Sequence, residues 1–411
     1  MSLTLQQQFR EETPEVARTH PEYVLKLVDA ILAGARNAGA SDVHLLPGED
    51  GLAMSWRVDG VLHPIDLLPR NLAPNVVARL KVLAQLLTYQ TDVPQEGRIH
   101  QVEGDAETRV STFPTLFGEK CVIRLFAGSN RFRYVDDLGF SPELALALKM
   151  MLERRGGVIL ITGPAGSGKT TSIYACLREI VERAAEPRSV ATLEDPVEAV
   201  MPGVAQSQIR PIAGFDYETG LKSLLRQDPE VIAVGEIRDR VTAQIAVQAA
   251  LTGHLILTTF HAGSAAEAIN RLLEMGLEPY QVRSALIAVL NQRLFRRLCE
   301  CATTSTDETA RLGLAVPRVR LPRGCEKCRG TGYLGRFLIA EFLIPEVHAI
   351  GRSILDRDDA IEIERKAIAG GMKTRWQRAC DCVSAGLTSP AEIRRVLGFE
   401  SPAQGLSTKH E

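Results

Sequence analysis

Two periodicities of apolar and polar positions divide the chain. Between Pro21 and Gly39 the apolar side chains recur at helical spacing, which predicts a helix. After Gly39 the pattern changes to short alternating runs that Gly, Pro and Asp separate, with one further helix expected over residues 74–87. We therefore expect an α+β domain over residues 21–127, after a polar lead-in over residues 1–20. The alternating runs predict antiparallel strands in SDVHLLPG, GLAMSWRVDGVLHPI, GRIHQV, TRVSTFPTLFG and KCVIRLF.

Continuous apolar runs replace the alternating ones in the second half. The segments GGVILITG, SVATLED, EVIAVGE and HLILTTFHA are largely apolar, as in strands buried on both faces, and helical patterns separate them. This alternation predicts an α/β domain with a mostly parallel sheet. The expected divisions are a linker over residues 128–139, the α/β domain over 140–298, a Cys-rich insertion over 299–335, a helical part over 336–400 and a tail over 401–411.

Composition limits the classes of function. The 411 residues suit two or three domains, and 45% hydrophobic residues are enough to fill their cores. The formal net charge of -2 lacks the basic excess of most polyanion-binding proteins. No apolar run approaches the roughly 18 residues of a membrane span, and the polar N-terminus is unlike a secretory signal. We expect an intracellular chain whose eight scattered cysteines stay reduced.

The segment GPAGSGKT matches the phosphate-loop pattern G-x-x-x-x-G-K-[ST] at every fixed position. It follows an expected strand over residues 158–162 and precedes an expected helix over residues 170–183. Glycines let backbone N–H groups converge on phosphate oxygens, and the helix N-terminus adds partial positive charge. We expect Lys169 to reach the β- and γ-phosphates of ATP and Thr170 to bind Mg²⁺; the alternative is a glycine-rich turn without a ligand. The expected nucleotide-binding residues are Gly163, Pro164, Ala165, Gly166, Ser167, Gly168, Lys169, Thr170 and Thr171.

Two expected strands end in carboxylates. Glu194 follows SVATL and Glu236 follows EVIAVG, and carboxylates at this end of parallel strands can hold Mg²⁺ or orient water. We assign Glu236 to polarising the attacking water, and Glu194 to tuning Glu236 or positioning the same water; solvated turn acids are the alternative. His261 ends a third strand and is a candidate sensor of the γ-phosphate, although a lone histidine is often structural.

With these blocks assembled, the chain resembles the secretion and pilus-assembly ATPases, which comprise the type II secretion ATPase and the related type IV pilus motors. The resemblance covers about residues 40–398. GPAGSGKTT is similar to the family's Walker A block, TLEDPVE (192–198) to its Asp box, LRQDPEVIAVGEIRD (225–239) to its Walker B block and TGHLILTTFHAGSA (252–265) to its His box. The resemblance implies a RecA-like ATPase domain that uses ATP and Mg²⁺, with the Cys-rich segment as a metal-binding insertion.

The N-terminal strands carry the same resemblance. SDVH (41–44), RVDG (57–60), QEGR (95–98) and RVSTFPT (109–115) are similar to the family's PAS-like domain. The resemblance implies that Arg109, Arg124 and Arg226 reach the nucleotide phosphates, whereas the residues alone would also suit solvated surface cations. Lys222 stands where relatives often have arginine, and lysine cannot make the planar bidentate contact.

Four cysteines form two close pairs, Cys299 with Cys301 and Cys325 with Cys328. Such pairs predict a structural zinc site, and four reduced thiols are the alternative. Assembly-type members of the family carry a zinc site of this kind, usually with two C-x-x-C pairs, whereas here the first pair is C-x-C. The nearby GTGY also resembles the family, and this places Arg336 as a further candidate near the nucleotide. The later pair Cys380 and Cys382 is interpreted as incidental.

Arginines gather around the cysteine insertion. They form either a solvated face or a docking surface for an acidic part of a membrane partner. The residues are Arg293, Arg296, Arg297, Arg318, Arg320, Arg323 and Arg329.

The leading hypothesis is a hexameric ATPase that powers assembly of a pilus or of a pseudopilus for type II secretion. The resemblance implies the homo-hexamer, an inner-membrane platform protein as partner, and a cytoplasmic location at the inner membrane. The alternatives are a retraction motor, a DNA-translocating ATPase, which the near-neutral charge disfavours, and a module that binds ATP only as a switch.

Overall fold

The computed structural model describes residues 4–13, 20, 22–99, 108–125 and 132–399, which form two compact units. Unit 1 comprises Met1–Gly128 together with Arg296–Ser305 and Arg320–Arg336, and unit 2 comprises the rest. The expected tail over 401–411 and part of the run GRIHQV lie outside the described residues. Among the described residues, no helix is both long enough and apolar enough to cross a membrane.

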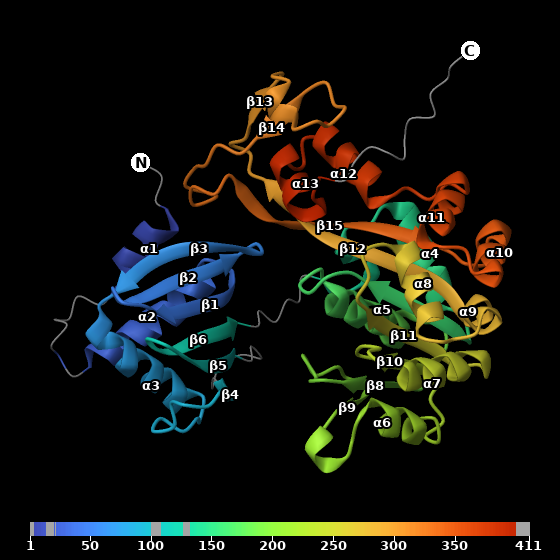
Figure 1. Cartoon of the computed structure of the whole chain (residues 1–411), viewed down its shortest axis with the longest axis horizontal. Helices are drawn as coiled ribbons and strands as arrows, with labels where there is room; N and C mark the ends of the chain where they lie inside the picture. The colour runs from blue at the N-terminus through green and yellow to red at the C-terminus, as the bar shows by residue number, and fades with distance from the viewer. Residues whose placement is uncertain (1–3, 14–19, 21, 100–107, 126–131, 400–411) are drawn as a thin grey trace. The chain divides into compact units, whose positions relative to one another are not determined.

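Unit 1 is built on a six-stranded sheet with the order β3-β2-β1-β6-β5-β4 (Figure 1). All its strand pairs are antiparallel, as the alternating runs predict. The run GLAMSWRVDGVLHPI holds two strands, because Asp59 and Gly60 take left-handed φ values of 49° and 83°, as a two-residue hairpin turn requires. The strands are β1 (Ala40–Pro47), β2 (Leu52–Val58), β3 (Val61–Leu68), β4 (Gln95–Ile99), β5 (Thr108–Thr115) and β6 (Gly118–Leu125).

Three helices accompany this sheet. The pattern predicts α2 (Tyr23–Asn37) well, and it predicts α3 (Ala73–Leu83) too long, because the chain turns at Gln85 with a φ of 58°. Helix α1 (Leu5–Glu12) lies in the expected polar lead-in and is not predicted. Its Phe9 is fully buried against Trp56 with the rings edge to face, 5.7 Å between centroids.

Unit 2 is built on a seven-stranded sheet with the order β15-β12-β7-β11-β10-β8-β9 (Figure 1). The pairs from β12 through β7, β11, β10 and β8 to β9 are parallel. Strand β15 is not predicted; its apolar run falls in the stretch expected to be helical, and short apolar runs do not distinguish strand from helix. The strands are β7 (Gly157–Thr162), β8 (Val190–Glu194), β9 (Ala205–Gln208), β10 (Val231–Val234), β11 (Leu255–Phe260), β12 (Leu286–Leu298) and β15 (Tyr333–Leu343). Strands β13 (Thr303–Ser305) and β14 (Val319–Leu321) form a separate two-stranded sheet.

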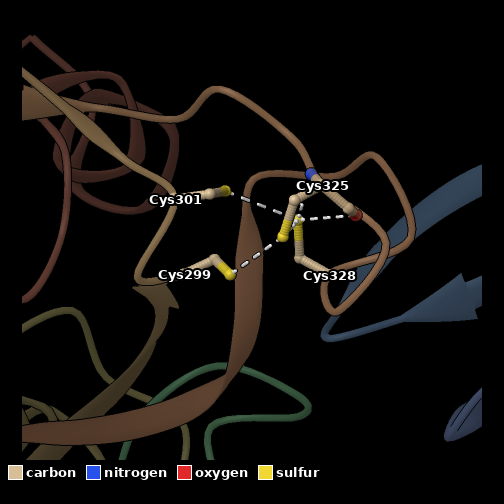
Figure 2. A group of neighbouring side chains, drawn as sticks. All are labelled: Cys299, Cys301, Cys325 and Cys328. Carbon is tan, nitrogen blue, oxygen red and sulfur yellow. Dashed lines mark hydrogen bonds between the residues drawn. The ribbon is translucent and has the colours of Figure 1, made fainter. Parts of the chain in front are cut away.

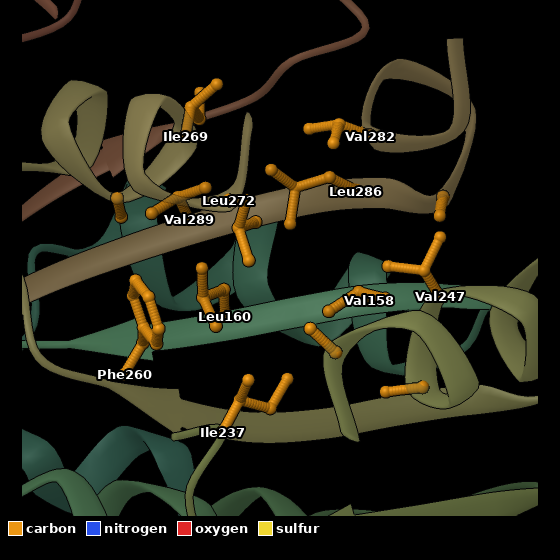
Figure 3. Close-up of a cluster of buried hydrophobic side chains, with 14 of the residues drawn as sticks. Val158, Leu160, Ile237, Val247, Phe260, Ile269, Leu272, Val282, Leu286 and Val289 are labelled. Atoms are coloured by element: carbon orange, nitrogen blue, oxygen red, sulfur yellow. The ribbon is translucent and has the colours of Figure 1, made fainter. Parts of the chain in front are cut away.

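Both faces of the central strands are buried. Val158 and Leu160 of β7 join one apolar cluster, and the alternate residues Ile159 and Ile161 join the other. Figure 3 shows the first cluster, in which Ile269 and other helical residues meet the sheet. This two-sided burial explains why these strands read as continuous apolar runs.

Ten helices are described in unit 2. Helices α4 and α5 contribute to one apolar cluster, and α7, α8, α9, α10 and α11 contribute to the other. Their bounds are α4 (Pro142–Leu152), α5 (Lys169–Arg183), α6 (Tyr217–Leu224), α7 (Arg240–Leu251), α8 (Ala265–Glu274), α9 (Pro279–Ala285), α10 (His348–Asp356), α11 (Ala360–Ala369), α12 (Arg375–Ser384) and α13 (Pro390–Leu397).

Candidate active site

The phosphate loop joins the end of β7 to the start of α5, which is the strand–loop–helix setting that its sequence predicts. Gly163, Gly166 and Gly168 take φ values of 147°, 73° and 90°, a region that favours glycine. A side chain at Gly163 would also collide with the loop's surroundings, because its Cβ would lie 2.5 Å from the carbonyl oxygen of Gln292. The backbone of the loop therefore depends on its glycines.

The side chains of the loop suit a polyanion. Lys169 Nζ donates to the carbonyl oxygens of Gly163 at 2.9 Å and Pro164 at 3.1 Å, and burial lowers the pKa of its ammonium group. Ser167 Oγ is buried without a hydrogen-bond partner among the described residues. Thr170 and Thr171 are exposed in the first turn of α5. A nucleotide phosphate would supply acceptors and negative charge where the loop concentrates donors.

Glu236 and His261 meet at the ends of neighbouring strands. Strands β10 and β11 pair in parallel, with Val234 opposite Thr258, so both chains leave the sheet at the same edge. His261 Nε2 lies 3.2 Å from Glu236 Oε1. The structure thus brings together the two residues that the sequence proposes for the γ-phosphate, and both line an open pocket of about 380 Å³.

Arg238 holds the other oxygen of Glu236. Its Nε lies 2.9 Å from Glu236 Oε2, and this hydrogen bond raises the pKa of the Arg238 guanidinium. Sequence reasoning did not single out Arg238, although it stands two residues after Glu236 in GEIRD. Glu236 is therefore oriented by a cation on one side and an imidazole on the other.

Glu194 lies at the end of β8 in a different environment. Its side chain is buried and accepts hydrogen bonds from the Tyr174 hydroxyl, from Thr192 Oγ1 at 2.6 Å and from Gln206 Nε2 at 3.1 Å. Burial raises the pKa of Tyr174. Because Tyr174 belongs to α5, its hydrogen bond to Glu194 links the end of β8 to the helix that begins at the phosphate loop.

Three consecutive polar residues of β12 bond to the end of β7, to the phosphate loop and to the segment after β11. Asn291 Nδ2 donates to Thr162 Oγ1 at 2.8 Å, Gln292 Nε2 donates to the Ser167 carbonyl at 3.0 Å, and Arg293 Nη2 donates to the Gly263 carbonyl at 2.7 Å. All three residues are buried. The prediction that Arg293 belongs to a solvated or docking face is therefore wrong. The available signal was the polar triplet inside the apolar run LIAVLNQRLF.

The expected phosphate-binding arginines of unit 1 lie in one cross-strand row. Arg109 is opposite Arg124 on one side and Arg98 on the other, and Arg124 is opposite Asp42. Opposite residues project from the same face of a sheet, and opposed like charges repel. Asp42 moderates this repulsion, since its carboxylate lies 3.1 Å from Arg124 Nε and 3.5 Å from Arg57 Nε. The row concentrates positive charge on one face, and the sequence analysis did not assign Arg98 to it.

Three further cations stand at positions that the resemblance singles out. Arg226 is exposed just after α6 in unit 2, and Lys222 on α6 pairs with Glu218 at 2.5 Å. Arg336 lies in unit 1, with its Nε 3.8 Å from Asp59 Oδ1. Contact of Arg226 and Arg336 with a nucleotide stays a prediction, whereas the lysine at position 222 cannot make the bidentate contact of the family's arginine.

Four cysteine sulfurs converge in unit 1 (Figure 2). All four Sγ atoms lie within 4.8 Å of one another, and three pairs are separated by 3.7–3.8 Å. Sulfurs bound tetrahedrally at about 2.3 Å from zinc would lie about 3.8 Å apart. The first pair reaches this geometry with one residue between its cysteines. The donor set therefore fits a zinc ion, and the described residues contain no other such group of His, Cys, Asp or Glu.

Backbone amides surround the same sulfurs. Cys328 Sγ accepts from the N–H groups of Cys325 at 3.1 Å and Gly332 at 3.2 Å. A backbone hydrogen bond from Cys328 lowers the pKa of Cys325 to about 7, and burial raises the pKa of Cys299 to about 12. N–H donors favour thiolates, which are the form that binds metal. Cys380 and Cys382 lie on α12 outside this group.

Comparison with known proteins places these features in one family. The model of the family described as Type II/IV secretion system protein matches residues 17–395. The chain belongs to this family. A type II secretion system protein E of Aeromonas hydrophila is 40% identical over 91% of this chain and 75% of its own length. The type IV pilus assembly ATPase PilB of Thermus thermophilus is 38% identical over 94% of this chain.

This Type II/IV secretion system protein matches only part of the length of some relatives, and it resembles solved structures of similar length. The chain spans 44% of the Thermus PilB and 66% of a type IV pilus assembly ATPase of Acinetobacter baylyi. Among solved structures, the alignment with the ATPase DotB of Legionella pneumophila covers 93% of this chain and 97% of DotB, with a TM-score of 0.68 and 20% sequence identity. The alignment with the pilus retraction motor PilT covers 91% of this chain and 97% of PilT, with a TM-score of 0.62 and 23% sequence identity. These two structures support the α/β fold.

Proposed function

We propose that this chain hydrolyses ATP to power the assembly of a pilus, or of a pseudopilus in type II secretion. One observation carries the proposal: in a Type II/IV secretion system protein, the phosphate loop follows β7 at the same edge of the parallel sheet where Glu236 and His261 pair after β10 and β11. The relatives' names include both pilus assembly ATPases and secretion proteins. The retraction motor is the runner-up, and the four-cysteine group favours assembly over retraction.

The proposed roles follow from the chemistry of each group. Lys169 neutralises the β- and γ-phosphates while backbone N–H groups of residues 165–171 cradle them, and Thr170 would hold Mg²⁺, which supplies Lewis-acid stabilisation of phosphate charge when bound. A water oxygen bonds to the γ-phosphorus, the bond to the bridging oxygen of ADP breaks, and Glu236 accepts the water's proton. His261 orients Glu236 and senses the γ-phosphate. Glu194, which the Tyr174 hydroxyl holds in place, tunes Glu236 or positions the same water. Arg109, Arg124 and Arg226 are proposed to contact the nucleotide phosphates.

The proposal also covers the domains of the chain and the assembly that it forms. We propose a RecA-like domain over residues 140–298, a PAS-like domain over 21–127, and a Cys-rich insertion over 299–335 in which Cys299, Cys301, Cys325 and Cys328 bind structural zinc. A homo-hexamer that works with an inner-membrane platform protein, on the cytoplasmic side, is proposed from family membership. No role for nucleic acid is proposed.

Two substitutions test the catalytic core. Lys169→Ala removes the loop's cation, so ATP binding should fall sharply. Glu236→Gln keeps the shape of the side chain but cannot accept a proton, so hydrolysis should fall by about 10²–10⁴-fold while ATP still binds. Steady-state hydrolysis and equilibrium binding of ATP with Mg²⁺ separate the two effects.

Glu186→Gln, just beyond α5, is the matched control, because it is also an isosteric loss of charge in unit 2, lies in an exposed pair with Arg155 and should leave hydrolysis unchanged. The motor proposal is wrong if the wild-type chain binds ATP yet hydrolyses it no faster than Glu236→Gln. Stimulation of hydrolysis by DNA would instead favour a translocating ATPase.

A further inference from the structure

Gln292 is a fully buried polar side chain that contacts both the phosphate loop and the helix that follows it. Its Nε2 donates to the Ser167 carbonyl at 3.0 Å, and its Oε1 accepts from the Ser172 hydroxyl at 3.0 Å. Ser167 belongs to the loop and Ser172 to the first turn of α5. The amide of Gln292 therefore bridges the loop and the helix from a strand that follows them by more than a hundred residues.

The contact with Ser167 fixes the direction of the next N–H group. The Ser167 carbonyl and the Gly168 N–H belong to one planar trans peptide, so they point in opposite directions. Because the carbonyl is directed at Gln292, the Gly168 N–H is directed to the other side of the loop. Gly168 takes a φ of 90°, a conformation that favours glycine, and a Cβ there would lie in ordinary contact with Gln292 Nε2, at 3.4 Å.

We infer that Gln292 is a positioning residue for ATP, which orients the Ser167–Gly168 peptide so that the Gly168 N–H donates to a phosphate oxygen. This inference rests on the proposed function, since it requires that the loop binds ATP. Gln292 itself does not touch the nucleotide. Asn291 and Arg293 flank it and reach Thr162 and Gly263, so the orienting side chain is held on a strand fixed at both neighbouring positions.

Gln292→Met tests the inference, because it keeps the length of the side chain and removes the donor. The loss of one orienting hydrogen bond should raise the KM for ATP and the dissociation constant by about tenfold. The kcat should change little, because a phosphate contact made equally in the ground and transition states affects binding alone. Ser172→Ala is the control: it removes the hydroxyl that contacts Oε1 and leaves the Ser167 contact, so ATP affinity should stay within about twofold of wild type.

Gln292→Glu adds a readout that simple packing would not give. An ionised carboxylate repels the Ser167 carbonyl, whereas a protonated carboxyl donates to it, so ATP affinity of this variant should improve as the pH falls. In the wild-type chain, ATP should slow hydrogen exchange at the Gly168 amide. Absence of this protection would overturn the inference even where a variant fails to fold.

The outcomes separate the two proposals. If the wild-type chain does not bind ATP, the proposed function fails. If it does bind ATP, but folded Gln292→Met binds equally well or the Gly168 amide gains no protection, only the inference about Gln292 is overturned.

Discussion

Two serine hydroxyls near the phosphate loop have opposite environments. Ser167 Oγ is buried without a hydrogen-bond partner in the described part of the chain, whereas Ser172 Oγ donates to Gln292 Oε1 at 3.0 Å. A buried hydroxyl without a partner opposes folding, because it loses its hydrogen bonds to water. The hydroxyl of Ser167 therefore lowers the free energy of unfolding, whereas the hydroxyl of Ser172 raises it.

This contrast gives a prediction for two alanine variants. Ser167→Ala should leave the free energy of unfolding within about 0.5 kcal/mol of wild type or raise it, because no hydrogen bond is lost. Ser172→Ala should lower the free energy of unfolding by about 1–3 kcal/mol, because Gln292 Oε1 is left buried without its donor. Urea unfolding without nucleotide measures both. A larger loss of stability for Ser167→Ala than for Ser172→Ala would contradict this account.

At the scale of elements, the sequence predicts strands best where burial is uniform. Strands β7, β10 and β11 are buried throughout, so their apolar runs are unambiguous. Helix α1 escapes prediction because Leu5 and Phe9 are its only large apolar residues. The sequence finds the loop, Glu236 and His261 through local motifs. It misses the contacts of Gln292 and Arg238, because strand order sets the partner of Gln292 and side-chain direction sets that of Arg238. The polar triplet in LIAVLNQRLF marks the position of Gln292 but not its partners.

Helix α5 carries a second set of contacts at its C-terminal end. Glu182 accepts from the Tyr134 hydroxyl at 2.5 Å and from Arg133 Nη2 at 2.9 Å, and the Arg183 guanidinium lies 3.6 Å from the centre of the Tyr134 ring. Val135, in the next position, is fully buried. Residues 133–135, in the later part of the expected linker, therefore pack against and hydrogen-bond to the helix that starts at the phosphate loop.

The hydrogen bonds between Glu182 and residues 133 and 134 should depend on pH. The hydrogen bond from Tyr134, and then that from Arg133, lowers the pKa of Glu182 below its ordinary 4.5. A lowered carboxyl pKa contributes stability above pH 4.5 that is lost as the pH falls through the folded-state pKa. Glu182→Gln should therefore lower the melting temperature by roughly 1–3 °C at pH 7, and this difference should shrink below pH 4.5.

The control for this prediction is Glu186→Gln. Glu186 lies just beyond α5, and its carboxylate is 3.6 Å from Arg155 in a pair that is more than four-fifths exposed. Its melting temperature should equal that of the wild type at both pH values. A difference for Glu182→Gln that persists unchanged at pH 3 would show that charge does not fasten this segment.

At the scale of the whole molecule, the cysteine group brings together segments that are distant in sequence. The group draws Cys299 and Cys301, just after β12, together with Cys325 and Cys328, just before β15. A bound ion would close the intervening stretch of chain into a loop and stabilise the folded form, since an unfolded chain offers no assembled site. The stretch between β12 and β15 is then expected to depend on metal for its order.

Metal analysis tests this expectation. The purified chain should contain one zinc per chain, and Cys325→Ser should lose it and melt at a lower temperature. A strong chelator should lower the melting temperature of the wild type, and zinc retention should fall at acid pH, where the thiolates protonate. Cys380→Ser on α12 is the control and should keep full zinc content. Zinc-free wild type with unchanged melting temperature under chelation would favour four reduced thiols.

The length of α5 has a mechanical consequence. Its fifteen residues span about 22 Å, with the phosphate loop at one end and the contacts to Arg133 and Tyr134 at the other. A tilt of about 5° about the loop end would carry the far end through about 2 Å, because an α-helix behaves as a stiff rod over this length. A tilt of this kind would therefore move the contacts to Arg133 and Tyr134 further than any other part of the helix.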